Sequence, residues 1–175
     1  MTNGEFAILS LIVEKPRHGY EIEGVIEQRG MREWTEIGFS SIYYLLKKLE
    51  ADGLVHSRLE SAYKPARKVY SITPEGEAAW RTGTYRALSE PERCSHPIQV
   101  GLSNLPGLAP EKALEALRQY LDRLEERQQH ITRRWESQKP TPYFVEAMFE
   151  HSLVLIAGEI GWARKWVHQL EEQNG

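Results

Sequence analysis

Apolar residues recur along the first half of the chain with the spacing of amphipathic helices, which bury one face and expose the other. The pattern predicts helices over residues 3–15, 18–30 and 40–52, and a fourth from 75 into the eighties. Local residues support these limits, because Pro16 ends the first helix, Gly30 the second, and Gly53 follows the third. Thr73-Pro74 supplies an N-cap and a first-turn proline for the fourth.

Between the third and fourth helices, two short alternating runs predict a β-hairpin. They cover Leu54–Leu59 and Lys68–Ile72, and a turn-rich, basic stretch (61–67) separates them. The order is therefore helix, helix, helix, hairpin, helix. That order is typical of a winged helix-turn-helix.

The second half of the chain predicts a long helical hairpin. A Pro- and Gly-rich stretch from Gly83 to Pro110 is expected to be a linker with a short helical piece over Ile98–Leu105. Beyond it, two long helices flank Pro140-Thr141-Pro142, and each carries a heptad row of apolar residues. The rows are Leu114, Leu117, Leu121, Leu124, Gln128, Ile131 and Trp135 on the first helix, and Phe149, Leu153, Ile156, Ile160, Ala163, Val167 and Leu170 on the second.

The second long helix has another apolar row, formed by Met148, Leu155, Trp162 and Trp166. Two apolar faces need two partners, so we expect one to close the hairpin and the other to meet a second chain. We predict a homodimer of a mainly α protein with a small β-hairpin wing. Its expected parts are a winged helix-turn-helix (1–85), a linker (86–110) and an antiparallel helical dimerisation domain (111–175).

The third predicted helix separates into a core face and a polar face. Ile42, Leu45, Leu46 and Leu49 fall on one side, and Ser40, Tyr44, Lys47 and Lys48 fall on the other, with Ser41 and Tyr43 at its edges. Hydroxyls at a helix N-terminus bind phosphates or base edges, tyrosine offers an apolar ring with a polar tip, and lysine neutralises phosphate. The polar face is therefore a candidate DNA-recognition surface.

Charge supports a local rather than a global attraction to nucleic acid. The chain has 175 residues and a formal net charge of −3, yet residues 40–70 carry six cations against three anions. The cations are Lys47, Lys48, Arg58, Lys64, Arg67 and Lys68. Two adjacent lysines alone are more typical of a solvated face, but together with the basic hairpin tip they favour nucleic acid.

Five strings in their order and spacing resemble the PadR family of bacterial transcriptional regulators. They are Ile8-Leu9-Ser10-Leu11, His18-Gly19-Tyr20-Glu21-Ile22, Ser41-Ile42-Tyr43, residues 46–54 (LKKLEADGL) and residues 67–76 (RKVYSITPEG). The long C-terminal helices resemble the longer subgroup of the family in architecture.

The resemblance implies a dimeric repressor whose third helix enters the major groove of a palindromic operator. It places Ser41 and Tyr43 in the recognition helix, Tyr20 near phosphate, and Lys64, Arg67 and Lys68 in the wing. For Tyr20 and Tyr43, ordinary core packing is the alternative. Tyr44 departs from the family, in which many members have proline at this position.

The resemblance also implies that a small aromatic or phenolic effector releases the DNA. The aromatic residues of the C-terminal part fit such a ligand, and the candidate effector-binding residues are Trp135, His151, Trp162 and Trp166. Tryptophans at helical spacing are more often residues of a dimer core, and since both interpretations predict the same spacing, the sequence does not decide between them.

Other classes of function find little support. No phosphate loop, zinc-ligand pattern or nucleophile elbow is present, so we expect neither an enzyme nor a cofactor or metal. The single cysteine, Cys94, excludes an internal disulfide framework and leaves a redox role open. Since no stretch is long and apolar enough to span a bilayer, we expect a cytoplasmic protein. The alternative function is a winged-helix dimer that binds an acidic protein instead of DNA.

Overall fold

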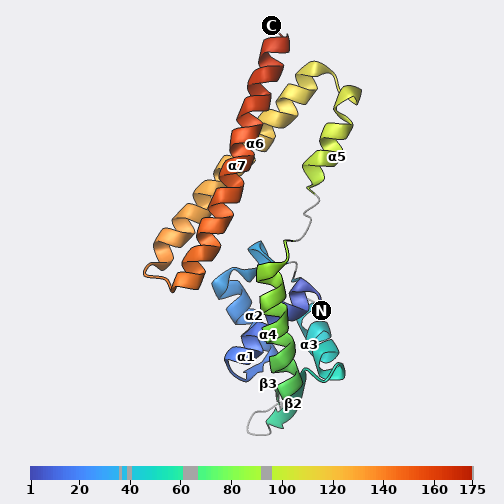
Figure 1. Ribbon diagram of the computed structural model, residues 1–175, viewed down its shortest axis with the longest axis vertical. Coiled ribbons are helices and arrows are strands. Elements are labelled where there is room, and N and C mark those ends of the chain that lie inside the picture. Colours follow the sequence, from blue (N-terminus) through green and yellow to red (C-terminus); the bar gives the residue numbers. More distant parts are fainter. Residues whose placement is uncertain (36, 39–40, 61–66, 92–95, 175) are drawn as a thin grey trace. The chain divides into compact units, whose positions relative to one another are not determined.

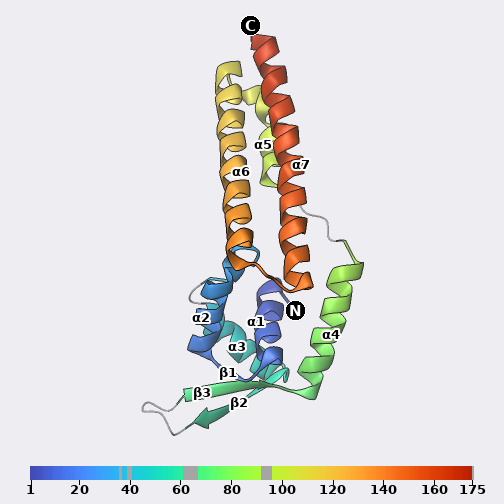
Figure 2. The same cartoon turned by 90° about the vertical axis from the view of Figure 1, so that its left-hand side faces the viewer.

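The computed structural model describes residues 1–35, 37–38, 41–60, 67–91 and 96–174. The chain divides into two compact units, Met1–Arg93 and Cys94–Gly175. Figures 1 and 2 show the elements of both units from two directions.

The first unit contains the four helices that the apolar pattern predicts. They are α1 (Asn3–Glu14), α2 (Gly19–Arg29), α3 (Ser41–Ala51) and α4 (Pro74–Ser89), with a short 3-10 helix η1 (Met31–Glu33) after α2. Thr2 and Thr73 cap α1 and α4 through their hydroxyls, and Gly30 ends α2 in the left-handed conformation at φ 56°. The start of the expected linker is wrong, because α4 continues through residues 83–89.

The wing is a three-stranded antiparallel sheet in the order β1-β3-β2. Strands β2 (Val55–Glu60) and β3 (Arg67–Ile72) form the predicted hairpin, with Val55 opposite Ile72 and Glu60 opposite Arg67. The third strand, β1 (Arg17–His18), pairs with Tyr70 and Val69 of β3 and was not predicted. Its pairing ties the start of α2 to the base of the wing.

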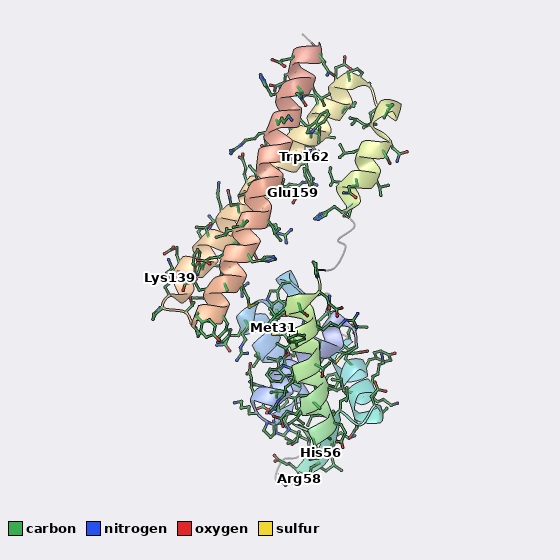
Figure 3. All side chains as sticks on the ribbon, viewed as in Figure 1. Met31, His56, Arg58, Lys139, Glu159 and Trp162 are labelled. Atoms are coloured by element: carbon green, nitrogen blue, oxygen red, sulfur yellow. The ribbon has the colours of Figure 1, made fainter. Side chains whose placement is uncertain are left out.

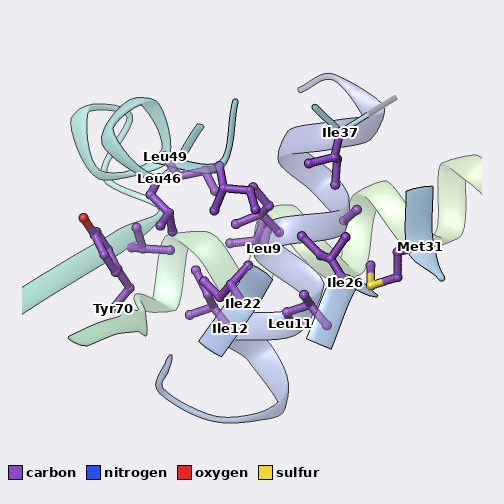
Figure 4. Close-up of a cluster of buried hydrophobic side chains, with 14 residues drawn as sticks. Leu9, Leu11, Ile12, Ile22, Ile26, Met31, Ile37, Leu46, Leu49 and Tyr70 are labelled. Atoms are coloured by element: carbon purple, nitrogen blue, oxygen red, sulfur yellow. The ribbon is translucent and has the colours of Figure 1, made fainter. Parts of the chain in front are cut away.

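A single apolar cluster fills the centre of the first unit (Figure 4). It joins α1, α2 and α3 to the sheet, and its fully buried side chains include Ile8, Leu9, Ile22, Ile42 and Leu46. Burial of an aliphatic side chain of this size contributes about 1.5–3 kcal/mol. The core therefore fixes the orientation of α3, whose opposite face is solvent-exposed.

The second unit is built on a long helical hairpin. It consists of α5 (Pro97–Ser103), a 3-10 helix η2 (Leu105–Gly107), α6 (Pro110–Gln138) and α7 (Tyr143–Asn174). Helices α6 and α7 run side by side in both views (Figures 1 and 2), and Leu124, Ile156, Ile160 and Ala163 form the buried cluster between them. Every residue of the two predicted heptad rows is buried or half-buried, so the antiparallel helical hairpin is confirmed.

None of the helices in the described part of the chain is long and apolar enough to cross a membrane.

Candidate nucleic-acid interface

Helix α3 exposes two tyrosines while it buries its apolar face. Tyr43 and Tyr44 have exposed fractions of 58% and 68%, whereas Ile42 and Leu46 are buried. Ser41 is half-buried at the first residue of the helix, and Ser40 lies outside the described residues. The separation of faces predicted from the sequence is therefore present, and the helix presents aromatic rings, hydroxyls and Lys47 to solvent.

Gly19 makes room for the ring of Tyr43. A Cβ atom at residue 19 would lie 2.6 Å from Tyr43 Cε1 and 3.2 Å from its Cζ, closer than carbon atoms approach. The glycine of the His-Gly-Tyr string thus lets the α3 tyrosine lie against the start of α2. This contact fixes the ring at the edge of the exposed face without burying it.

Tyr20 lies at the other side of the same glycine and contacts the wing. Core packing was the alternative for Tyr20, but its ring is half-exposed. The Tyr20 hydroxyl accepts a hydrogen bond from Arg67 Nη1 at 2.9 Å, and the Arg67 guanidinium lies 4.7 Å from the centroid of the ring. The structure therefore brings together two of the predicted DNA-binding residues.

Lys48 is held by an acid from α1. Its Nζ donates to the carboxylate of Glu5, which is only 4% exposed and also accepts from the main-chain N–H of Thr2 at 2.9 Å. Burial raises the pKa of Glu5, but the hydrogen bonds from Lys48 and Thr2 outweigh it and leave the pKa below its ordinary value. The same contact raises the pKa of Lys48. The charge of Lys48 is thus compensated within the protein, in contrast to the role expected from its place on the polar face.

Lys68 is also near an acid. Its Nζ lies 3.5 Å from Glu50 Oε2, and Glu50 accepts from the Ser57 hydroxyl as well. The Ser57 bond is the main cause of the lowered pKa of Glu50, with Lys68 adding to it. Lys47, by contrast, is exposed and has no acidic partner among the described residues. Lys64 lies outside those residues.

The described residues thus place the exposed face of α3 beside the base of the wing. Tyr44 and Lys47 project from α3, while Tyr20, Arg67 and Lys68 lie at the junction of α2 and β3. A helix with exposed tyrosines can contact base edges, and flanking phenol, guanidinium and ammonium groups can contact phosphates. His56 and Arg58 lie on β2 (Figure 3).

The candidate effector residues of the second unit do not converge on one site. Trp135 of α6 stacks on Phe149 of α7 with centroids 6.0 Å apart, and Lys139 lies 4.6 Å from its ring. Trp162 lies 13 residues after Phe149 on the same helix, which corresponds to about 20 Å. His151 and Trp166 are exposed on α7. Within the single chain, these four residues therefore do not line one common pocket among the described residues.

Trp162 instead packs beside a half-buried polar pair. Tyr120 of α6 donates its hydroxyl to the carboxylate of Glu159, one turn before Trp162 on α7 (Figure 3). Burial, with the neighbouring carboxylate, raises the pKa of Tyr120 to about 12. Two open surface hollows of this unit are lined by Gln128, Gln129, Thr132 and Arg133, and by Lys139, Pro140, Thr141 and Glu146, and no tryptophan lines either.

Sequence reasoning missed Gly19 and Glu5 as parts of this interface. Glycine before Tyr20 was seen only as part of a string, because the tyrosine that packs on it is far along the chain. Glu5 has a local signal, since it completes a capping box with Thr2. Its second partner on α3 could be found only from the tertiary structure.

Comparison with known families identifies the first unit. Residues 8–82 match the family described as the transcriptional regulator PadR-like family, which confirms the predicted resemblance. The family is one of transcriptional regulators, consistent with the expectation of a protein that is not an enzyme. No curated protein matches the chain.

Solved structures share the fold of the whole chain. Bacillus subtilis PadR in complex with operator DNA is 19% identical, with a TM-score of 0.77 over 95% of this chain and 98% of that one. The same protein in complex with p-coumaric acid is 18% identical, with a TM-score of 0.78 and the same coverage. The Vibrio cholerae virulence activator AphA is 18% identical, with a TM-score of 0.75 over 97% of this chain and 98% of that one.

Proposed function

We propose that this chain, which carries a PadR-like transcriptional regulator domain over residues 8–82, is a sequence-specific DNA-binding repressor that acts as a homodimer on a palindromic operator. Its α3 helix enters the major groove, and the wing contacts adjacent backbone. The proposed DNA-binding residues are Tyr20, Ser40, Ser41, Tyr43, Tyr44, Lys47, Lys64, Arg67 and Lys68. Lys48, which the sequence also placed in this set, is left out because Glu5 compensates its charge.

The observation that carries this proposal is the exposed face of α3 beside the Tyr20–Arg67 pair. Tyr43 and Tyr44 are large rings in water, and neither is needed to close the core. Exposed aromatic side chains on a helix with a neighbouring basic wing are typical of a nucleic-acid contact surface. Among the lysines of α3, Lys47 is the stronger phosphate ligand, because Glu5 already neutralises Lys48.

The second unit supports the homodimer. Phe144, Met148, Leu155 and Trp166 share one side of α7, and all four are exposed in the single chain. An exposed apolar row of this length is typical of a protein–protein interface. A twofold axis through α7 would present two α3 helices to two half-sites, about 34 Å or a multiple of that apart.

A small aromatic effector is the proposed release signal. The indole Nε1 of Trp135 is buried without an acceptor among the described residues, and Lys139 lies over the same ring. A planar acid would supply an acceptor for the indole and a negative charge for the lysine. Bacillus subtilis PadR has been crystallised with p-coumaric acid, which makes this acid a suitable first probe.

The proposal is tested by titrating the protein against the promoter upstream of its own gene and a random duplex of equal length. Both titrations run at about 150 mM salt, near physiological ionic strength. A sequence-specific regulator binds the promoter at least a hundredfold more tightly, and added p-coumaric acid weakens that complex. Equal, weak binding to both duplexes would favour the alternative of a winged-helix dimer that binds an acidic protein.

A further inference from the structure

Gly19, the first residue of α2, lies against the ring of Tyr43, the third residue of α3. A Cβ atom at residue 19 would lie 2.6 Å from Tyr43 Cε1, 3.2 Å from Cζ and 3.3 Å from Cδ1. These three atoms are consecutive along one edge of the ring, and Cζ carries the hydroxyl. Gly19 is buried, although Tyr43 itself is 58% exposed. The first turn of α2 therefore determines where this edge of the ring and the hydroxyl lie.

The Tyr43 hydroxyl is available to a partner outside the chain. It makes no hydrogen bond within the described part of the chain, and its ring does not belong to the buried core. In a helix-turn-helix, the N-terminal residues of the recognition helix contact base edges in the major groove. A phenol hydroxyl can both donate to and accept from a base. The place of Tyr43 near the start of α3 therefore suits a contact with a base edge.

The missing side chain at residue 19 matters for the position of this ring and not for the fold. Gly19 does not have a positive φ, so its backbone conformation does not require glycine. A methyl group there would meet the outer atoms of a side chain, which can turn to another staggered rotamer. At Gly76, in contrast, a methyl group would meet the main-chain oxygen of Leu54, which moves only with the backbone. A side chain at residue 19 therefore displaces the Tyr43 ring while the helices stay in place.

We propose that Gly19 is a specificity-determining residue, because its lack of a side chain holds the Tyr43 hydroxyl in the position that contacts a base edge of the operator. This inference rests on the proposed function. A larger residue turns the ring aside, so the hydroxyl loses its base while Lys47 and the wing keep their contacts with phosphates. The protein then loses affinity for its promoter and keeps its affinity for a random duplex.

The test is a double-mutant cycle in the full-length protein, with Gly19→Ala and Tyr43→Phe made singly and together. Tyr43→Phe keeps the ring beside Gly19 and removes only the hydroxyl. Each single substitution is expected to lower the ratio of promoter affinity to random-duplex affinity about tenfold, the equivalent of one hydrogen bond. The double variant should also lose about tenfold, because both substitutions remove the same contact. A combined loss of about a hundredfold would mean that the two residues act independently, and would overturn the inference.

Two other glycines separate ring placement from folding. Gly24→Ala is the matched control, because Gly24 also lies in α2 and nothing is within 4 Å of a Cβ atom built on it. It is expected to leave the affinity ratio unchanged. In chemical denaturation, Gly19→Ala should unfold with nearly the free energy of the unmodified protein, whereas Gly76→Ala should not. An equal loss of stability at residues 19 and 76 would mean that the Tyr43 ring cannot turn aside, and would contradict the inference.

Nuclear Overhauser effects in the DNA-free protein give an independent readout. We expect strong effects between the Hα protons of Gly19 and the ring protons of Tyr43, which persist in Gly24→Ala and are lost in Gly19→Ala. Their persistence in Gly19→Ala, or an unchanged affinity ratio in that variant, would overturn the inference and leave the proposed function intact. If the unmodified protein binds its promoter and the random duplex equally, the proposed function fails together with the inference.

Discussion

At the scale of single residues, the neighbouring lysines Lys47 and Lys48 are expected to play different parts. The Lys48 ammonium is bonded to Glu5, whereas Lys47 has no acid beside it in the described chain. We predict that Lys47→Ala weakens binding to all duplexes and reduces the salt slope by about 1 per bound protomer. Lys48→Ala should leave both the affinity for DNA and the salt slope nearly unchanged. Titrations at several salt concentrations, with an expected starting slope of about −5 to −9, would measure this difference.

Tyr44 belongs to a different kind of contact. Its side chain makes no hydrogen bond within the described part of the chain, and it is more exposed than Tyr43. Tyr44→Ala is therefore predicted to weaken binding to the promoter more than to a random duplex, because a base contact is lost while the phosphate contacts remain. The ratio of the two dissociation constants measures the effect. An equal loss of affinity for the promoter and the random duplex would mean that Tyr44 contacts the DNA backbone instead of a base.

Glu5 links this surface to stability in acid. Its pKa in the folded protein lies below its ordinary value, so the stability that it contributes is present above the unfolded pKa, about 4.5, and is lost as pH falls through the folded value. Glu5→Gln is predicted to lower the thermal midpoint at pH 7. The difference in thermal midpoint between the variant and the unmodified protein should shrink as the pH falls below 4.5. Melting curves between pH 3 and 7 test this sign. A difference that grows toward low pH would contradict it.

The sequence predicted which residues of α3 face solvent, since helical periodicity alone determines this. It did not predict that Glu5 compensates Lys48, because that contact spans 43 positions. Tyr20 shows the same limit. Its sequence position left core packing open as an alternative, and only the stacking with His18 and the bond from Arg67 show that its ring lies at the surface.

At the scale of elements, Gly76 holds α4 against the start of the wing. A Cβ atom there would lie 1.9 Å from the main-chain oxygen of Leu54, an oxygen that also accepts from Thr73 N. We predict that Gly76→Ala destabilises the first unit by about 1–3 kcal/mol, because backbone must move to admit the methyl group. Chemical denaturation measures this change.

Gly24 provides the matched control. It lies within α2, with nothing within 4 Å of a Cβ atom built on it. Gly24→Ala should stabilise the protein by about 0.5–1 kcal/mol through helix propensity alone. Destabilisation of similar size by both substitutions would show that the Leu54 contact is not the cause of the loss at residue 76.

The elements differ in how far local sequence determines them. Helices α1 to α4 and the hairpin have caps, prolines and regular periodicity, and all were predicted. Strand β1 has only two residues and exists because Arg17 and His18 pair with β3, more than 50 positions away. A strand that is too short to show alternation has no pattern of its own to detect.

At the scale of the whole molecule, the helical unit is expected to set the oligomeric state. We predict that a chain ending after Leu105 is monomeric and binds DNA weakly and without specificity, because it lacks α6 and α7. Sedimentation and promoter titration of this truncated chain test both statements. Tight promoter binding by the shortened protein would mean that the dimer forms through another surface.

A point substitution tests the same interface without removing the helices. Leu155 lies in the exposed apolar row of α7 and is 61% exposed in the single chain, so Leu155→Glu would place a charge in the proposed dimer contact while leaving the α6–α7 seam intact. We predict a folded, helical monomer with at least a hundredfold weaker promoter binding.

The matched control is Val154→Glu. Val154 is the preceding residue, 71% exposed and about 100° around the helix, so its substitution should leave the dimer whole. Light scattering gives the mass of each variant. A dimer that survives Leu155→Glu but not Val154→Glu would show that the dimer contact lies on the Val154 side of α7.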